Sequence, residues 1–133
     1  QLTPTTLVNQ LPQVQEVFKH SSPGNRLYIL KKLPRELWKD EKVSQSFFQT
    51  FANVDINTRT MLLNNLKYAH PSVVNILVED LEQMSKNQLS TFLNYLTENR
   101  QYLNGQVKTK LTQAAQNKSF TENYVIESFL KSN

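Results

Sequence analysis

The sequence is poor in the residues on which cross-linked and all-β proteins depend. It contains no Cys, and only 2 Gly and 5 Pro among 133 residues. The absence of Cys excludes disulfide bonds, thiol catalysis and thiolate metal sites. Because few residues can supply the positive φ angles of tight hairpin turns, an all-β fold is disfavoured. The absence of continuous β-branched runs also argues against a parallel sheet.

Long apolar segments are missing too. No run approaches the roughly 20 apolar residues of a membrane-spanning helix, and no secretory leader is recognisable. A length of 133 residues predicts a single domain over 1–133, large enough to bury a core without disulfides or metal. The compartment stays open. A chain without Cys leans towards an intracellular protein, whereas a first residue Gln1 fits a processed exported protein or an excised domain.

No pattern typical of an active site, a cofactor site or a metal site is present. His20 and His70 are the only histidines, and neither has a second His one helical turn away, whereas a metal needs three or four converging ligands. There is no Gly-x-Ser-x-Gly motif and no Gly-rich phosphate loop. Glu79, Asp80 and Glu82 fit the solvated face of a helix better than an acid–base pair. We predict a non-enzymatic protein without cofactor or metal, with haem ligation by a histidine as an open alternative.

A short phrase of two apolar residues, two further residues and a Leu recurs along the chain. It occupies 29–33, 62–66 and 92–96, so its first residues Ile29 and Leu62 are 33 apart, and Leu62 and Phe92 are 30 apart. This spacing places the apolar members on one side of a helix. Recurrence at this interval is typical of stacked helical hairpins. Any two amphipathic helices match at Leu positions, so a true repeat and shared amphipathicity stay equal alternatives.

Apolar periodicity and capping residues predict an all-α fold with about eight or nine helices and no sheet. The expected arrangement is an irregular bundle or short solenoid of stacked antiparallel hairpins, because short connections make neighbouring helices antiparallel. We expect hairpins over 22–52, 55–84 and 85–117, a terminal helix over 121–131, and short helices before residue 21, the first covering Leu7 to Leu11. The expected helix caps are Ser22, Asp40, Asp55, Ser85 in a capping box with Gln88, and Thr121.

A short helical turn is expected inside the first hairpin. Residues 35–39 are predicted to form this turn, with Leu37 and Trp38 covering the corner. Two of the later helices are expected to be long. Pro71 is expected to open a helix whose apolar stripe reaches Met84, and the helix after Ser85 is expected to continue towards residue 103. His70 is expected to terminate the helix that precedes it, since a ring beside the last carbonyl groups is favourable.

The middle positions of the recurring phrase are the best candidates for contact with a partner. Equivalent positions in stacked hairpins line up into a ridge, which could hydrogen-bond an extended peptide or, through Asn and Tyr, single-stranded RNA. They fit equally the solvated side of each helix. The net charge is +4, and the basic residues are most concentrated around Arg35. Trp38 is expected to be partly exposed and to anchor a partner. The candidate partner-binding residues are Lys31, Lys32, Arg35, Trp38, Asn64, Asn65, Asn94 and Tyr95.

We predict a protein-binding scaffold or adaptor that uses a groove or ridge of consecutive helices, with another protein or a peptide as its partner. One alternative is RNA binding through the basic stretch, with an affinity that falls steeply with salt. The other is a small carrier of a lipid or other apolar ligand in a cavity lined by aromatic side chains, which fit a packed core equally well. The aromatic residues concerned are Phe47, Phe48, Phe51, Phe92, Tyr95, Tyr102 and Phe129.

Overall fold

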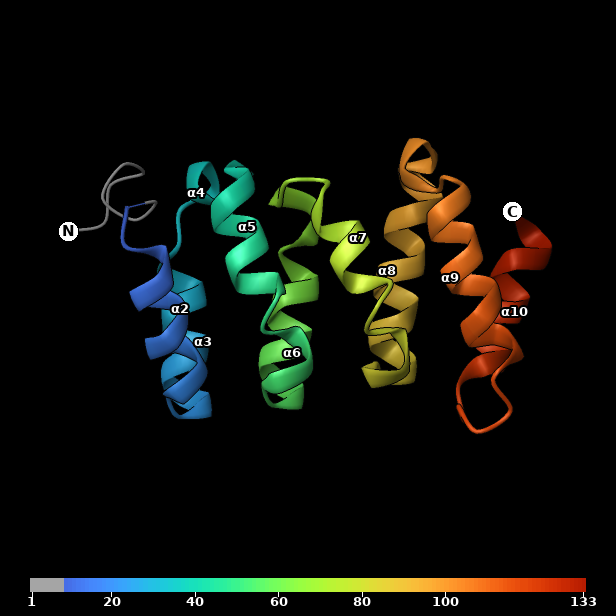
Figure 1. Ribbon diagram of the computed structural model, residues 1–133, viewed down its shortest axis with the longest axis horizontal. Coiled ribbons are helices and arrows are strands. Elements are labelled where there is room, and N and C mark those ends of the chain that lie inside the picture. The colour runs from blue at the N-terminus through green and yellow to red at the C-terminus, as the bar shows by residue number, and fades with distance from the viewer. Residues whose placement is uncertain (1–8) are drawn as a thin grey trace. The chain divides into compact units, whose positions relative to one another are not determined.

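The computed structural model describes residues 9–133, and this range is all α-helical. It contains nine α-helices and no strand, and 76% of the model is helical. The all-α prediction is therefore confirmed, whereas the helix expected over Leu7 to Leu11 lies largely outside the described residues. The α-helices of Figure 1 are α2 (Leu11–His20), α3 (Pro23–Lys32), α4 (Arg35–Lys39), α5 (Glu41–Phe48), α6 (Ile56–Asn64), α7 (Val73–Leu77), α8 (Lys86–Glu98), α9 (Gly105–Gln116) and α10 (Asn123–Ser132).

Short 3-10 turns follow four of these helices. They are η1 (Phe51–Asn53), η2 (Leu66–Tyr68), η3 (Leu81–Gln83) and η4 (Arg100–Tyr102). The chain separates into two compact units, the first ending at Val73 and the second beginning at Val74. The expectation of a single domain over 1–133 stays a prediction.

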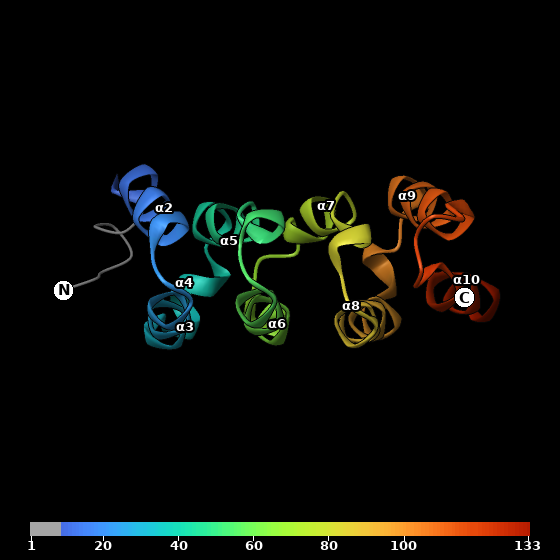
Figure 2. The same ribbon diagram turned by 90° about the horizontal axis from the view of Figure 1, so that it is seen from below.

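The first unit consists of two layers of helices around an aromatic core. Figure 2 shows α2 and α5 in one layer and α3 and α6 in the other, and α3 packs against α6 while α2 packs against α5. Phe18 meets Phe47 edge to face with the ring centroids 5.2 Å apart. Pairs of this kind contribute about 0.5–1.5 kcal/mol beyond the area that they bury. This aromatic pair therefore joins α2 and α5, the neighbouring helices of one layer.

Trp38 belongs to this core, so the expectation of a partly exposed tryptophan is wrong. Its side chain is 1% exposed, and its ring centroid lies 6.0 Å from those of both Phe47 and Phe48. The reason is the single turn of α4, which points Leu37 and Trp38 inwards and leaves the charged Arg35 on the surface. A charged sequence stretch here covers an aromatic core.

The second unit has the same two-layer plan with a mainly aliphatic core. Figure 2 shows α7 and α9 in one layer and α8 and α10 in the other, and α10 packs against both α8 and α9. Its fully buried side chains include Leu89, Phe92, Leu111 and Ile126. Within each unit the helices pack against one another in pairs, and the hairpin bounds expected from the sequence stay a prediction.

Four of the five predicted caps are confirmed. Ser22, Asp40, Asp55 and Ser85 each accept a hydrogen bond from the main-chain amide three residues further on, at 3.3, 3.0, 3.1 and 3.2 Å. Gln88 returns a side-chain acceptor to the amide of Ser85 at 3.0 Å and completes the capping box. Such a cap contributes about 1 kcal/mol, so these residues define where four helices begin.

Three helix boundaries differ from the prediction. The helix expected from Pro71 to Met84 is α-helical only over Val73–Leu77 and continues later as η3. The helix after Ser85 ends at Glu98. The last helix begins at Asn123 after Glu122, without a side-chain cap, so Thr121 is not its cap. The apolar side chains between Val73 and Met84 are nevertheless largely buried, because periodicity records which side chains face the core and not which backbone hydrogen bond is made.

The role expected of His70 is also different. Its Nδ1 lies 2.9 Å from the hydroxyl of Ser72 and accepts a hydrogen bond from the amide of Ser72 at 3.2 Å. Its own amide donates to the hydroxyl of Ser44 at 3.0 Å. His70 thus stabilises the turn that leads into α7 instead of terminating α6, which ends at Asn64.

One side-chain arrangement recurs at the 33-residue step. Arg26 of α3 donates two hydrogen bonds to main-chain carbonyl groups at the end of α2, and Arg59 of α6 donates two to carbonyl groups of η1. The acceptors are Phe18 and Lys19 for Arg26, and Phe51 and Ala52 for Arg59. Amphipathicity alone does not require such a tie. This tie is therefore common to α3 and α6, whereas α8 carries Leu89 at the corresponding place, four residues after its cap.

Candidate functional site

A hollow of about 330 Å³ lies on the first unit among α3, α4, α6 and η2. We call it the basic hollow. Five of the eight predicted partner-binding residues line it. Its lining residues are Leu30, Lys31, Leu33, Arg35, Trp38, Met61, Asn64, Asn65, Lys67 and Tyr68.

The charge around the basic hollow is of one sign. Lys31, Arg35 and Lys67 are exposed cations, and its lining includes no carboxylate. None of the three side chains takes part in an ion pair or a hydrogen bond within residues 9–133. Three like charges around one hollow repel one another, and an anion placed there would relieve this repulsion.

Tyr68 holds two of the cations. The Arg35 guanidinium carbon lies 4.5 Å from the centroid of its ring and the Lys67 ammonium lies 5.3 Å from it. Contacts of this kind at exposed sites contribute about 0.5–1 kcal/mol each. They restrain both side chains without neutralising them, so the positive charge stays available to a ligand.

The floor of the basic hollow is apolar and buried. Leu30 and Trp38 are each 1% exposed, and Leu33 is buried beside them. On the rim, the Asn65 side chain donates to the Met61 carbonyl at 2.9 Å, whereas Asn64 is exposed. A polar, positively charged rim thus surrounds a packed floor, an arrangement that suits a ligand with one anionic group and some apolar surface.

The remaining predicted residues lie elsewhere. Lys32 is absent from the lining of the basic hollow, and its ammonium lies 5.3 Å from the centroid of the exposed Tyr28 ring. Asn94 lines a different hollow in the second unit. Tyr95 stacks on Tyr102 with centroids 6.3 Å apart and the ring planes 10° from parallel. Burial raises the pKa of Tyr95 and the neighbouring Tyr102 raises it further, so Tyr95 stays a neutral phenol.

Sequence reasoning missed Lys67 and Tyr68. Both directly follow Leu66, the last residue of the recurring phrase, and lie in η2. The available signal was the Lys-Tyr pair at the end of a helix that already carried two candidate residues. The pair was missed because it lies outside the helical pattern on which the candidates were chosen.

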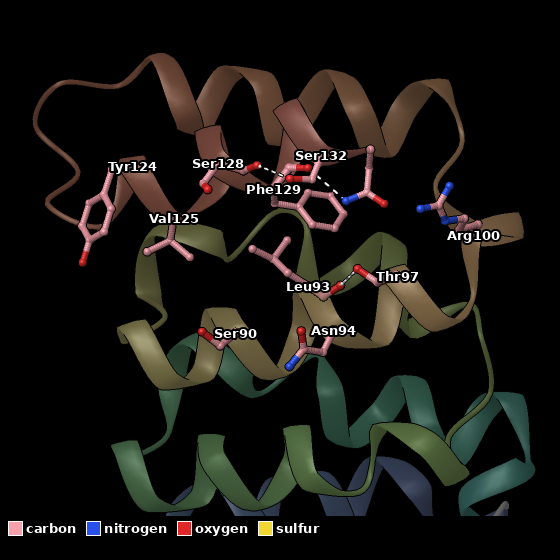
Figure 3. Close-up of a pocket in the computed structure, with 11 residues that line it drawn as sticks. Ser90, Leu93, Asn94, Thr97, Arg100, Tyr124, Val125, Ser128, Phe129 and Ser132 are labelled. Atoms are coloured by element: carbon pink, nitrogen blue, oxygen red, sulfur yellow. Dashed lines mark hydrogen bonds between the residues drawn. The ribbon is translucent and has the colours of Figure 1, made fainter.

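The second unit carries a larger hollow between α8 and α10, with a volume of about 590 Å³. We call it the α8–α10 hollow. Figure 3 shows Leu93, Val125 and Phe129 facing it, with Tyr124 and Arg100 towards its opposite ends. The rest of its lining is neutral and polar, and consists of Ser90, Asn94, Thr97, Ser128, Ser132 and Asn133.

The seven aromatic residues considered for an apolar cavity are divided between the units. Phe47, Phe48 and Phe51 are core side chains of the first unit, and the other four belong to the second. Of the seven, Phe129 is the one that lines the α8–α10 hollow. A cavity lined by all seven is therefore not formed within either unit.

Two of the acidic residues considered for acid–base chemistry, Glu79 and Glu82, have structural partners. Glu79 forms an ion pair with Lys110 at 3.1 Å, and Glu82 accepts a hydrogen bond from Asn117 at 2.9 Å. Among residues 9–133 no three His, Asp or Glu side chains gather as a metal site would require. In the same range, none of the helices combines the length and apolar character needed to cross a bilayer.

No family model matches this chain, and comparison with curated proteins and with solved structures gave no match.

Proposed function

We propose that this protein is a non-enzymatic adaptor that binds an acidic segment of another protein at the basic hollow. The observation that carries the proposal is the convergence of Lys31, Arg35 and Lys67 from three elements around one hollow without a carboxylate in its lining. Complementary charge favours the encounter with an acidic partner and disfavours a basic one. Pairs of helices packed side by side commonly present such surfaces to partners.

The size of the basic hollow limits what it accepts. A volume of about 330 Å³ suits one or two side chains, so the rest of the partner's segment would lie along the exposed sides of α3 and α6. The half-buried Met61 and Tyr68 offer apolar contact beside the charges. The ligand is thus an acidic side chain with an apolar neighbour, presented on an extended or helical segment.

Fluorescence anisotropy with labelled degenerate peptide pools tests this proposal. A pool rich in Asp and Glu should bind more tightly than a Ser/Gly pool of equal length. The double variant Lys31→Glu/Arg35→Glu should weaken that binding at least about tenfold, because hydrogen bonds to charged groups contribute about 1.5–3 kcal/mol each. The matched control is Lys108→Glu, which reverses an exposed charge on α9 of the second unit. Equal binding of both pools, or unchanged affinity of the double variant, would contradict the proposal.

RNA is the rival ligand for the same residues. Tyr68 with Arg35 could stack on a base, and the exposed Asn64 could hydrogen-bond its edge. An oligouridylate of about 12 nucleotides, within the usual footprint of single-strand binders, serves as a competitor of the acidic pool. Tighter binding of the oligonucleotide than of the acidic pool, lost in the double variant, would replace the protein partner with RNA.

The α8–α10 hollow supports a second candidate function, the carriage of a small apolar ligand. Its volume of about 590 Å³ lies within the range of about 300–1,000 Å³ of small-molecule sites, and Leu93, Val125 and Phe129 give it an apolar lining. Native mass spectrometry of the purified protein tests this function. A co-purifying fatty acid that is lost in Phe129→Ala would establish it, whereas a ligand-free mass that stays unchanged after incubation with oleate would exclude it.

A further inference from the structure

We propose that the group selected by the basic hollow is a phosphorylated side chain of the partner, in preference to a carboxylate. This inference rests on the proposed function, because it names the chemistry of the acidic segment that the adaptor binds. It also makes the association dependent on modification of the partner.

The number of cations is the first argument. A carboxylate carries one negative charge, whereas a phosphoryl group on Ser, Thr or Tyr carries about 1.5–2 at neutral pH. Lys31, Arg35 and Lys67 line one hollow with no lining carboxylate to balance them. A single carboxylate leaves most of this charge uncompensated, and a phosphoryl group compensates more of it at one point.

The supply of hydrogen-bond donors is the second argument. Arg35 brings five N–H donors in a planar fork, Lys31 and Lys67 bring three each, and the Asn64 amide brings two. The three cations spend none of theirs on an acceptor within residues 9–133. A phosphoryl group offers three acceptor oxygens, and a guanidinium pairs with two of them at once.

The restraint on these donors is the third argument. Arg35 and Lys67 both lie over the Tyr68 ring, at 4.5 and 5.3 Å from its centroid. Arg35 also begins α4, whose Leu37 and Trp38 are each 1% exposed in the core. The cations therefore project from a packed frame, which lowers the entropy lost when a ligand orders them.

The test compares three labelled peptide pools that are identical except for a fixed central residue, which is phosphoserine, Glu or Ser. The phosphoserine pool should bind about tenfold more tightly than the Glu pool, through the additional charge-assisted hydrogen bonds. Inorganic phosphate should displace it at a lower concentration than acetate does. Arg35→Lys keeps the charge but removes the fork, so it should reduce the preference for phosphoserine over Glu, while Lys108→Glu should leave the preference unchanged. Circular dichroism checks that each variant is folded.

The outcomes separate this inference from the function on which it rests. Equal affinity for phosphoserine and Glu pools, both above the Ser pool, would overturn the phosphate preference and leave the acidic adaptor standing. Failure of both anionic pools to bind above the Ser pool would overturn both proposals. Displacement of the phosphoserine pool by oligouridylate at a lower concentration than any peptide pool requires would overturn both in favour of RNA. An unchanged phosphoserine preference in a folded Arg35→Lys variant would remove Arg35 from the site.

Discussion

The two units share a layered plan but present different hollows. The basic hollow of the first unit has three cations and an aromatic ring on its rim, whereas the lining of the larger α8–α10 hollow is neutral apart from Arg100. The middle positions of the recurring phrase supply Lys31, Asn64 and Asn65 to the first hollow and Asn94 to the second, and Arg35, Lys67 and Tyr68 from outside the phrase complete the charged rim of the first. The shared helical plan therefore does not determine the charge of a hollow, and a few exposed residues do.

The cores of the two units also differ. Phe18, Trp38, Phe47 and Phe48 form an aromatic cluster in the first unit, while the second unit buries mainly Leu, Val and Ile. Trp38 is the only tryptophan in the chain, so its fluorescence reports on the first unit alone. This makes the comparison between the units measurable.

The largest expected effect is the loss of a core ring. Phe48→Ala should destabilise the first unit by about 3–5 kcal/mol, since it removes a fully buried ring that contacts Trp38. The free energy of unfolding, measured in urea with Trp38 fluorescence as the signal, should fall by this amount. Leu111→Ala in the second unit, expected to cost about 2–5 kcal/mol, should shift the circular dichroism transition and leave the fluorescence transition nearly in place. Equal shifts of both signals in both variants would show that the two units unfold together.

The arginine tie of the first unit should give a smaller effect. Arg59→Met keeps the aliphatic length but removes two hydrogen bonds to main-chain carbonyl groups, at 2.9 Å each. Because the donor is charged, we expect a loss of about 2 kcal/mol, measured by the midpoint of the Trp38 fluorescence transition. Leu89→Met, at the corresponding place in α8 of the second unit, provides the control and should cost less than about 1.5 kcal/mol by circular dichroism. If Arg59→Met left the free energy of unfolding unchanged, the recurring arginine tie would not stabilise the first unit.

A still smaller effect should appear in the pH dependence of the first unit's stability, through Asp55. Burial would raise the pKa of Asp55, but hydrogen bonds from the side chain and amide of Thr58, and from Arg26, outweigh it and lower the pKa below 3.8. The stabilisation is therefore present above about pH 4 and is lost as the pH falls through the lowered pKa of the folded state. Asp55→Asn retains a capping oxygen and removes this dependence. The stability difference between the parent protein and this variant should shrink on acidification, and a difference that stays constant to low pH would contradict the prediction.

The smallest effect concerns Tyr95 in the second unit. Burial, with Tyr102 beside it, raises its pKa above 10.0. Phenolate absorbance should show one late-titrating tyrosine that disappears in Tyr95→Phe and persists in the control Tyr28→Phe, whose ring is 60% exposed. Any stabilisation from the neutral phenol is present below pH 10 and lost as the pH rises through the raised pKa. An alkaline titration that Tyr95→Phe leaves unchanged would contradict the raised pKa of Tyr95.

The local rules of helix formation explain which features of the fold were predictable. Ser22, Asp40, Asp55 and Ser85 act within three residues of themselves, so their capping roles could be read from the chain. The early end of the helix after Pro71 could not, because its apolar side chains are buried whether the backbone is α-helical or 3-10. The prediction that Thr121 caps the last helix was also wrong, because a turn over Phe120 to Asn123 precedes α10.

The candidate site was only partly predictable. Lys31, Asn64 and Asn65 followed from their equivalent places in the recurring phrase and Arg35 from the basic stretch after it, whereas Lys67 and Tyr68 join them through the turn of η2. Trp38 was chosen as an exposed anchor because its neighbours in sequence are charged, and it is the floor of the same hollow instead. Neighbours in sequence do not reveal which side of a five-residue helix faces a core.

The sequence by itself determined that the chain is helical, where most helices begin and which side chains are apolar enough to be buried. These properties depend on interactions among residues a few positions apart. Only the tertiary structure decided that Trp38 is buried, that Arg35 and Lys67 share one ring, and that Lys31 lines the same hollow. The physical reason is that packing brings together residues more than 30 positions apart, and the register of one helix against another is set by the shapes of all the side chains between them.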